Sequence, residues 1–263
     1  MKTVLICHKE AHLSYYGIGH WLNSFSELAG IVVINEDPSR KRTRIKKELK
    51  RSGIFGLIDV LLFRVYYKFF KAARDSEKDK KLLNELTNRF KENSIEDVPR
   101  IEVETPNAEE ARKFIEDKSP DFTIARCKFL LKQAVFDIPK FGTYVFHPGI
   151  CPEYRNAHGC FWAIVNNDYE RVGMTMLRID KGIDTGPVYG YFSYDYDPMK
   201  ESHIEIQNRV VFDNLGAIKK KILEVFEGKA KSVEVDKNRK SGVWGQPQLF
   251  PYLRWKWRYK GKY

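Results

Sequence analysis

Two short apolar runs near the start of the chain flank an amphipathic stretch. Thr3–Cys7 and Gly30–Ile34 are continuous rather than alternating runs of apolar residues, which is typical of strands buried in a parallel sheet. The segment between them, Gly17–Leu28, predicts a helix. A strand, a helix and a second strand in this order form a βαβ unit.

The same alternation of helical and strand patterns resumes after about residue 100. It predicts an α/β fold with a mainly parallel, Rossmann-like sheet and helices on both faces. Ligands bind such sheets at the carboxyl ends of strands, and His147 stands at one of these ends. The expected elements are the helices Ala108–Lys118, Leu131–Phe136 and Arg209–Phe226 and the strands Phe122–Arg126 and Gly142–His147.

Residues 38–98 interrupt this alternation, and we expect them to form a basic helical insertion. Eight of the twelve residues in Arg40–Arg51 are basic, and the aromatic-rich stretch Ile54–Lys71 predicts a helix. Two interpretations of that helix are open: it packs on the body with a solvated basic stripe, or it lies on an anionic membrane or a lipid-linked substrate. At about 100° per residue, the basic residues that share one side of it are Arg64, Lys68 and Lys71.

Composition and charge narrow the classes of partner. Hydrophobic residues make up 43% of the 263 residues, which is enough for a core and excludes a wholly disordered chain. Lys and Arg number 46 against 35 Asp and Glu, a net charge of +11 that favours phosphates, nucleotides, nucleic acid or an acidic membrane.

The four cysteines show no spacing typical of a zinc site or a disulfide scaffold, so no metal is expected. No signal peptide or spanning helix is expected either. The expected location is therefore the cytoplasm, peripheral to the inner face of the membrane if the insertion binds lipid.

The segment from Gly142 to Gly190 carries the residues with the most specific chemistry. A strand ends at His147-Pro148, and a loop, a helix and a Gly173-Met174-Thr175 strand follow. Asp184-Thr185-Gly186-Pro187 comes 37 residues after the histidine. In this order, these motifs resemble the folate-dependent formyltransferase family, which includes glycinamide ribonucleotide, methionyl-tRNA and nucleotide-sugar N-formyltransferases. The resemblance extends over about residues 100–225.

The resemblance implies a formyltransferase fold over residues 1–228 and transfer of a formyl group from 10-formyltetrahydrofolate to an amine. A strand-end histidine stabilises the oxyanion or moves a proton, and a loop carboxylate orients it and accepts the proton. His147 and Asp184 match the family's catalytic residues. The residues that match its backbone contacts to the pterin are Arg126, Cys127, Leu130, Ile179, Asp180 and Gly182.

One departure from the family pattern concerns the oxyanion. The family carries asparagine two residues before the histidine, where this chain has Val145, whose side chain donates no hydrogen bond. Asn156 and His158 follow in the next loop, and we expect at least one of them to point into the cleft of His147 and supply the missing contact.

The C-terminal tail, residues 229–263, interleaves aromatic and basic residues. This pattern suits stacking on bases, contact with phosphates or an interfacial anchor, and it equally suits an extended tail packed back on the body. Thirty-five residues are too few for the C-terminal domain of the tRNA-directed relatives, so nucleic acid is not the expected partner. The expected acceptor is a small molecule or sugar phosphate, most of all an amino sugar linked to a nucleotide or lipid, and a homo-oligomer is left open.

Two other functions fit the same motifs. The first is a hydrolase that removes a formyl or related acyl group with water, which the valine at position 145 favours. The second is a non-catalytic formyltransferase-like module, against which the presence of both His147 and Asp184 counts.

Overall fold

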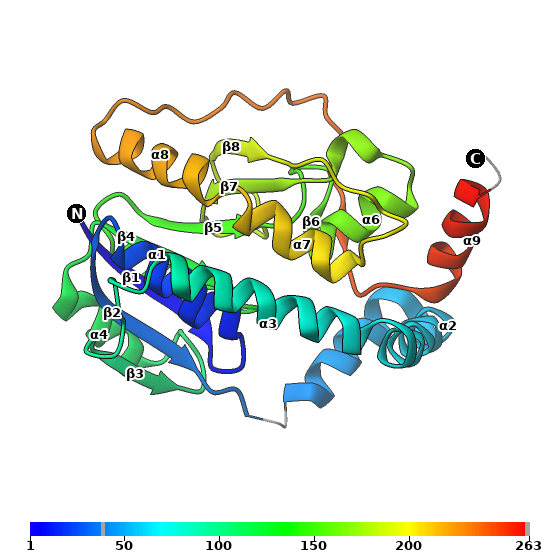
Figure 1. The fold of residues 1–263 in the computed structure, drawn as a ribbon, viewed down its shortest axis with the longest axis horizontal. Helices are drawn as coiled ribbons and strands as arrows, with labels where there is room; N and C mark the ends of the chain where they lie inside the picture. Colours follow the sequence, from blue (N-terminus) through cyan, green and yellow to red (C-terminus); the bar gives the residue numbers. More distant parts are fainter. Residues whose placement is uncertain (38–39, 261–263) are drawn as a thin grey trace.

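A seven-stranded sheet forms the centre of the molecule, and the computed structural model describes residues 1–37 and 40–260 (Figure 1). The strand order is β3-β2-β1-β4-β5-β7-β8. Its strands are β1 (Lys2–His8), β2 (Glu27–Ile34), β3 (Arg100–Val103), β4 (Phe122–Arg126), β5 (Thr143–His147), β7 (Met174–Arg178) and β8 (Val188–Phe192).

Five strands of this sheet, β3-β2-β1-β4-β5, pair in parallel, and β7 and β8 complete it as antiparallel strands. The predicted mainly parallel α/β fold is therefore confirmed. Because β5 lies beside parallel β4 on one edge and antiparallel β7 on the other, His147 stands where the strand direction changes within the sheet.

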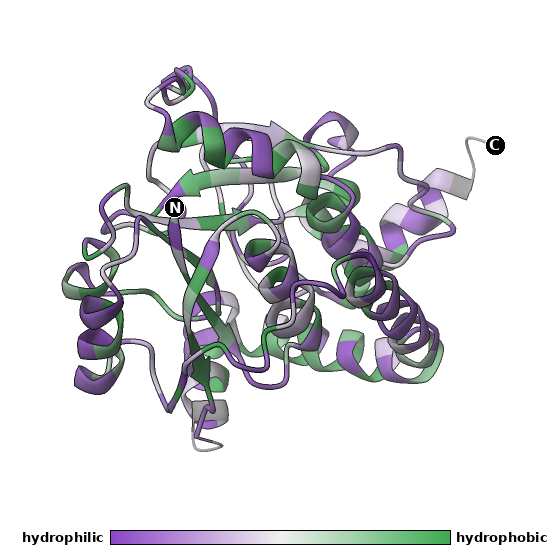
Figure 2. Cartoon of the chain, turned by 60° about the vertical axis from the view of Figure 1, so that its left-hand side comes forward, coloured by the Kyte–Doolittle hydropathy of each residue, from purple (hydrophilic) through white to green (hydrophobic). Residues whose placement is uncertain are grey.

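Helices cover both faces of the sheet, as the alternation predicts, and Figure 2 shows hydrophobic residues concentrated in the strands between them. Residues of α4 and α5 pack on one face, and residues of α1, α3, α6, α7 and α8 pack on the other. The helices of the body are the π-helical turn η1 (Leu13–Ile18), α1 (Gly19–Asn23), α3 (Ala72–Arg89), α4 (Glu109–Lys118), α5 (Gln133–Phe136), α6 (Gly159–Val165), the 3₁₀ turn η2 (Tyr169–Arg171), α7 (His203–Phe212) and α8 (Leu215–Phe226).

The prediction of a helix over Gly17–Leu28 was wrong at its C-terminal end. The helix ends at Asn23, and Glu27 and Leu28 already pair with Lys2 and Thr3 in the parallel ladder. Ladder hydrogen bonds to β1 outweigh the local helical preference of these residues, because a buried backbone group needs a partner.

The prediction of one helix over Arg209–Phe226 was also wrong, since two helices occupy this region. Helix α7 starts earlier because Ser202 and Glu205 form a capping box, with each side chain accepting from the other's backbone N–H. The break before α8 holds Asn214, whose side chain donates to the carbonyl groups of Ser193 and Val210.

The basic segment forms one long helix, α2 (Arg40–Phe70), with a kink at Gly53, whose φ is +69°. Val60 and Phe63 of α2 are buried, whereas most apolar side chains on its other side are exposed. The following helix, α3, buries Leu86 in the main core. Across residues 1–37 and 40–260, no helix is both long enough and apolar enough to cross a membrane.

The tail returns to the body and ends in a helix, so an extended tail throughout was a wrong expectation. The short strand β9 (Val243–Trp244) pairs with β6 (Arg155–Asn156), and α9 (Leu249–Lys260) follows beside α2 (Figure 1). Trp255 of α9 is 1% exposed, and its indole Nε1 donates to the Tyr169 hydroxyl over 2.9 Å. The expectation that tail aromatics pack back on the body thus holds for this residue, while Trp257 is 79% exposed.

Candidate active site

His147 and Asp184 lie side by side at the end of β5. The His147 side chain is buried, and 3.5 Å separates its Nδ1 from Oδ2 of Asp184. Its Nε2 lies 2.8 Å from the Tyr154 carbonyl oxygen. Since a carbonyl only accepts, Nε2 carries the proton of that bond, and Nδ1 is the nitrogen that faces the carboxylate.

The loop 179–187 carries Asp184 to this position. It begins at Ile179, whose N–H donates to the Thr143 carbonyl over 2.7 Å at the start of β5, and it reaches His147 at the end of that strand. The loop therefore runs along β5. Two features fix its shape: Oδ1 of Asp180 accepts from the Gly182 N–H and the Thr185 hydroxyl, and a Cβ at Gly186 would overlap the Arg178 carbonyl oxygen.

The loop that follows His147 holds the ring from the other side. A Cβ at Gly149 would lie 2.8 Å from Nε2 of His147, and a Cβ at Gly159 would lie 2.5 Å from the Gly149 Cα. Only glycine at both positions lets the backbone approach the ring closely enough for Tyr154 to accept from it. The loop thus fixes which nitrogen of His147 is available for chemistry.

Asn156 is next to the pair, but its backbone makes the contact. The Asn156 N–H donates to Oδ2 of Asp184 over 2.7 Å, and its side-chain Nδ2 donates to the Trp244 carbonyl. Asn156 is exposed and has a φ of +78°, a conformation that asparagine tolerates better than most residues. Within the described chain, the ring nitrogens of His147 face the Tyr154 carbonyl oxygen and the Asp184 carboxylate. The ring bonds neither of the two side chains that were expected to contact it, those of Asn156 and His158.

His158 lies deeper, at the start of α6, and its ring lies 5.8 Å from that of His203. Its Nδ1 is buried and, among the described residues, has no hydrogen-bond partner. Burial lowers the pKa of His158 to about 4, assisted by the positive charges of Lys128 and Arg64. Burial also lowers the pKa of His203. His158 therefore belongs to an uncharged pair of histidines rather than to the His147–Asp184 pair.

The buried pair of His158 and His203 predicts that acid destabilises the folded chain. The unfolded chain protonates His158 below about pH 6.5, whereas the folded chain keeps it neutral down to about pH 4, so the free energy of unfolding falls as the pH falls between these values. The shift corresponds to a loss on the order of 2–3 kcal/mol. We expect His158→Gln to flatten this slope in urea unfolding curves measured from pH 7 to pH 4. Parallel curves for the two proteins would contradict the assignment.

The residues expected at the pterin come from two segments that pack on the same side of the sheet. Cys127 and Ile179 both contact the apolar cluster beneath α4 and α5, and Leu130 is 58% exposed. Arg126 points instead to β5, where its Nη1 donates to the Phe146 carbonyl over 2.6 Å. Asp180 and Gly182 lie in the turn that shapes the 179–187 loop.

Val145 lies between these segments. It is partly exposed and precedes His147 by two residues, so both side chains point to the same face of the sheet. Cys151, by contrast, is 2% exposed, and burial raises the pKa of its thiol to about 12, which leaves it without thiolate character.

The tail contributes to the site in a way that the sequence did not indicate. Strand β9 pairs with Arg155 and Asn156, and the Trp244 ring stacks on that of Tyr154 at 5.8 Å. The Trp162 Nε1 donates to the Gly245 carbonyl over 2.9 Å. In the sequence, the aromatic residues of the tail were compatible with packing on the body, but they did not show which residues it contacts. The tail therefore braces the loop that carries Tyr154 and Asn156.

The formyl transferase family profile matches residues 73–222, which include β5, the loop 179–187, and both His147 and Asp184. The chain belongs to the formyl transferase family. The match begins at α3, well before residue 100, where the sequence motifs first indicated the family.

Two curated relatives resemble this chain in sequence. A methionyl-tRNA formyltransferase of Kosmotoga olearia is 32% identical over 147 residues, which cover 55% of this chain and 42% of the relative. The human mitochondrial 10-formyltetrahydrofolate dehydrogenase is 29% identical over 105 residues, which cover 40% of this chain and 11% of the relative. The chain thus spans less than half the length of the curated relatives it matches.

The fold extends this likeness to solved structures. A sugar N-formyltransferase from Shewanella matches 92% of this chain and 77% of its own, with a TM-score of 0.52 and 13% identity. At that identity the match shows a shared fold, and it includes regions outside the sequence profile.

Proposed function

We propose that this formyl transferase moves a formyl group from 10-formyltetrahydrofolate to an amino group, most of all on a nucleotide-linked or lipid-linked amino sugar. The observation that carries the proposal is the His147–Asp184 pair, held 3.5 Å apart with little solvent access beside two loops. The name of the human relative, which contains 10-formyltetrahydrofolate, supports the choice of donor.

The donor supplies an activated formyl group on a flat pterin ring system. The residues present fit such a ring, because Cys127 and Ile179 provide an apolar floor and the loops that follow them provide backbone donors and acceptors. Leu130 and Ile183, 58% and 42% exposed, are apolar side chains in these loops. We propose that the backbone of 126–130 and 179–184 holds the pterin.

The central pair handles the charge and the proton of the transfer. A new bond forms between the acceptor nitrogen and the formyl carbon, and the bond from that carbon to the donor nitrogen breaks. The acceptor nitrogen loses a proton, and the donor nitrogen gains one. Nδ1 of His147 carries no proton while Nε2 donates to Tyr154, so the acceptor's proton reaches Nδ1 through Asp184, and Nδ1 then directs it toward the formyl oxygen, where negative charge develops. Asp184 holds the ring and accepts the acceptor's proton, directly or through water.

The positive charge of the chain indicates the class of acceptor. A net charge of +11 favours an acceptor that carries phosphate groups, which both nucleotide-linked and lipid-linked sugars do. This attraction does not require the nucleobase of a nucleotide-linked sugar.

The test mixes the purified protein with 10-formyltetrahydrofolate and a panel of nucleotide-linked amino sugars. The expected result is an acceptor whose mass increases by one carbonyl group, formed at least about 10²-fold more slowly by the His147→Gln variant. Release of formate at the same rate with and without acceptor would instead establish a hydrolase. Formylation of methionyl-tRNA alone would overturn the choice of acceptor.

The missing asparagine leads to a separate prediction. We propose that Asn156, rather than His158, supplies the second donor to the formyl oxygen, since its backbone N–H bonds Asp184 and its Nδ2 carries a second proton besides the one that bonds Trp244. Asn156→Gly keeps the positive φ and removes the carboxamide, and we expect kcat to fall by about 10²-fold. Asn167→Gly, also at positive φ, is the matched control. Equal activity of the two variants would exclude this role.

A further inference from the structure

The second half of α2 presents a wide apolar face to solvent. Beyond the kink at Gly53, the buried residues Val60 and Phe63 face the body. Large apolar side chains around the rest of the helix, with Phe70 at its end, are between 40% and 85% exposed: Ile54, Phe55, Ile58, Leu61, Leu62, Val65 and Phe69.

The positions of these residues on the helix form a continuous stripe. At about 100° per residue, Ile54, Ile58 and Leu61 share an arc of about 60°, and Val65 and Phe69 extend it along the helix. The exposed residues Arg64 and Lys68 lie directly beside this arc, whereas Lys71 follows the end of α2 and lines a cavity between α2, α7 and α9. The helix is therefore apolar on its inner and outer sides and basic along one flank.

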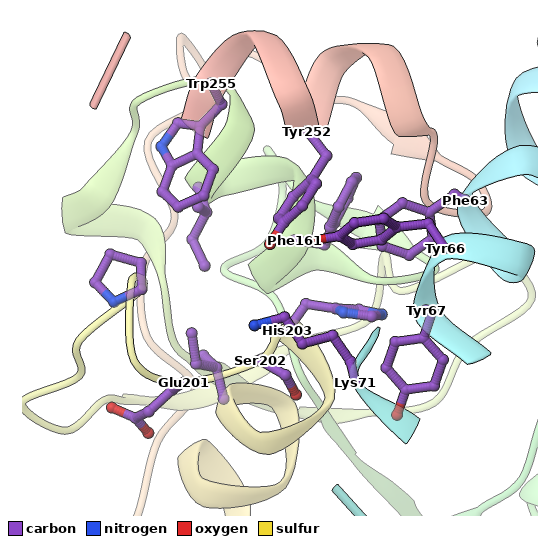
Figure 3. A pocket seen from close by; sticks show the side chains of 13 residues that line it. Phe63, Tyr66, Tyr67, Lys71, Phe161, Glu201, Ser202, His203, Tyr252 and Trp255 are labelled. Carbon is purple, nitrogen blue, oxygen red and sulfur yellow. The ribbon is translucent and has the colours of Figure 1, made fainter. Parts of the chain in front are cut away.

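Helix α9 packs against the buried side of α2. Oδ1 of Asp59, on the inner side of α2, accepts from the N–H groups of Leu249 and Phe250 over 2.8 and 3.0 Å and so caps the start of α9. Phe63 and Tyr252 meet edge to face at 5.6 Å. A small cavity of about 20 Å³ lies between α2, α7 and α9. Phe63, Tyr66 and Tyr67 of α2, His203 of α7, and Tyr252 and Trp255 of α9 are among the residues that line it (Figure 3).

The exposed side of α9 has a composition similar to that of the exposed face of α2. Phe250, Leu253 and Trp257 are 64%, 42% and 79% exposed, and Arg254 and Arg258 are exposed among them. We call the exposed apolar residues of α2 and α9, with their basic neighbours, the α2–α9 surface.

The first half of α2 adds positive charge beside this surface. Arg42, Lys46, Lys47 and Lys50 are exposed, and Glu48 pairs with Arg51. The only acids in the two helices are Glu48 and the buried Asp59. The positive charge of this surface repels a second copy of the same surface and attracts an anionic surface.

We propose that the α2–α9 surface docks on the interface of an anionic membrane. Phenylalanine, leucine, isoleucine and tryptophan side chains gain free energy when they leave water for the boundary of the acyl chains, and the flanking arginine and lysine side chains meet the lipid phosphates. Charge favours an anionic lipid surface over a second copy of the chain as the partner. If two copies met through this surface, their basic residues would lie close together and repel each other.

The docking surface connects with the catalytic loop through the tail. Asn156 bonds Trp244, Gly245 accepts from Trp162, and Leu249 is capped by α2. If the proposed formyl transfer holds, docking presents the site to an amine on a membrane-borne acceptor, which favours the lipid-linked class over the nucleotide-linked one. The docking itself does not depend on formyl transfer.

The test measures co-sedimentation with vesicles of phosphatidylglycerol and phosphatidylcholine, with no formyl donor present. We expect binding to these vesicles at low salt, much weaker binding to pure phosphatidylcholine, and loss of binding toward 1 M salt, where the Debye length is about 3 Å. Phe55→Ser with Phe69→Ser, and separately Arg64→Glu with Lys68→Glu, should each lower the partition coefficient at least about tenfold.

Matched controls separate this site from general attraction. Lys91→Glu with Lys200→Glu makes the same charge change at residues 74% and 81% exposed elsewhere, and it should leave binding within about twofold. Spin-labelled lipids should quench Trp257, and Trp257→Phe should remove that quenching. Absence of binding at low salt, an equal loss in the Lys91/Lys200 variant, or unchanged binding after the phenylalanine substitutions would overturn the proposal. So would a stable dimer that the phenylalanine substitutions dissociate.

Discussion

Replacement of His147 by glutamine is expected to lower kcat for formyl transfer by about 10²–10⁴-fold, the range that general acid–base catalysis contributes. Glutamine still donates to Tyr154 but has no second nitrogen to face Asp184. Asp184→Asn keeps the shape of the side chain, cannot accept the proton, and should cost a similar factor. Because the two residues act as a unit, the double variant should lose little more than either single one.

Steady-state kinetics and thermal unfolding of each variant test this expectation together. Asp213→Ala, which removes a carboxylate that pairs with Arg209 on the surface of α7, is the matched control and should retain full activity. Multiplicative losses in the double variant would show that His147 and Asp184 act independently. An Asp184→Asn enzyme with normal kcat would remove the carboxylate from the mechanism.

Replacement of Trp255 by alanine is expected to cost about 3–5 kcal/mol in the free energy of unfolding, the usual range for deleting a fully buried aromatic side chain. The substitution empties a site against Tyr252 and Tyr259 and leaves the Tyr169 hydroxyl without the indole N–H. Trp257→Ala, two residues away on the same helix, removes a side chain that is 79% exposed and should change the free energy by less than about 0.5 kcal/mol.

Urea unfolding followed by circular dichroism distinguishes these two tryptophan variants, and hydrogen exchange shows how the loss is distributed. If α9 detaches before the body unfolds, its amides should lose protection first in the Trp255→Ala protein. Equal effects of the two substitutions would mean that α9 does not pack on α6 and η2 as described.

The sequence predicted which residues meet in the proposed catalytic centre because they stand in local motifs. His147-Pro148 and the Asp184-to-Pro187 turn each stand at a strand end or a tight turn, and glycine and proline mark such places in the sequence itself. The sequence could not show that Tyr154 binds Nε2 of His147. That contact depends on how closely Gly149 and Gly159 approach each other, which is a property of the folded loop.

Expectations about Asn156 and His158 show the same limit within one loop. Both follow His147 by about ten residues, and only the backbone conformation decides that Asn156 turns toward Asp184 while His158 joins His203. Helix ends were missed for a related reason. Local preference favoured a helix through Leu28, but pairing with β1 recruited Glu27 and Leu28 into a strand.

By itself, the sequence determined the mainly parallel sheet, the strand end at His147 and the pairing of His147 with the Asp184 loop, because continuous apolar runs and turn residues act over short distances along the chain. Only the tertiary structure decided which side of α2 is buried, that the tail forms α9 beside it, and that β9 braces the loop that carries Tyr154 and Asn156. Those outcomes depend on contacts between residues about 90 to 190 positions apart, such as Asn156 with Trp244 and Asp59 with Leu249. An apolar helix has the same pattern whether a protein or a lipid covers it, and only packing shows which faces remain open.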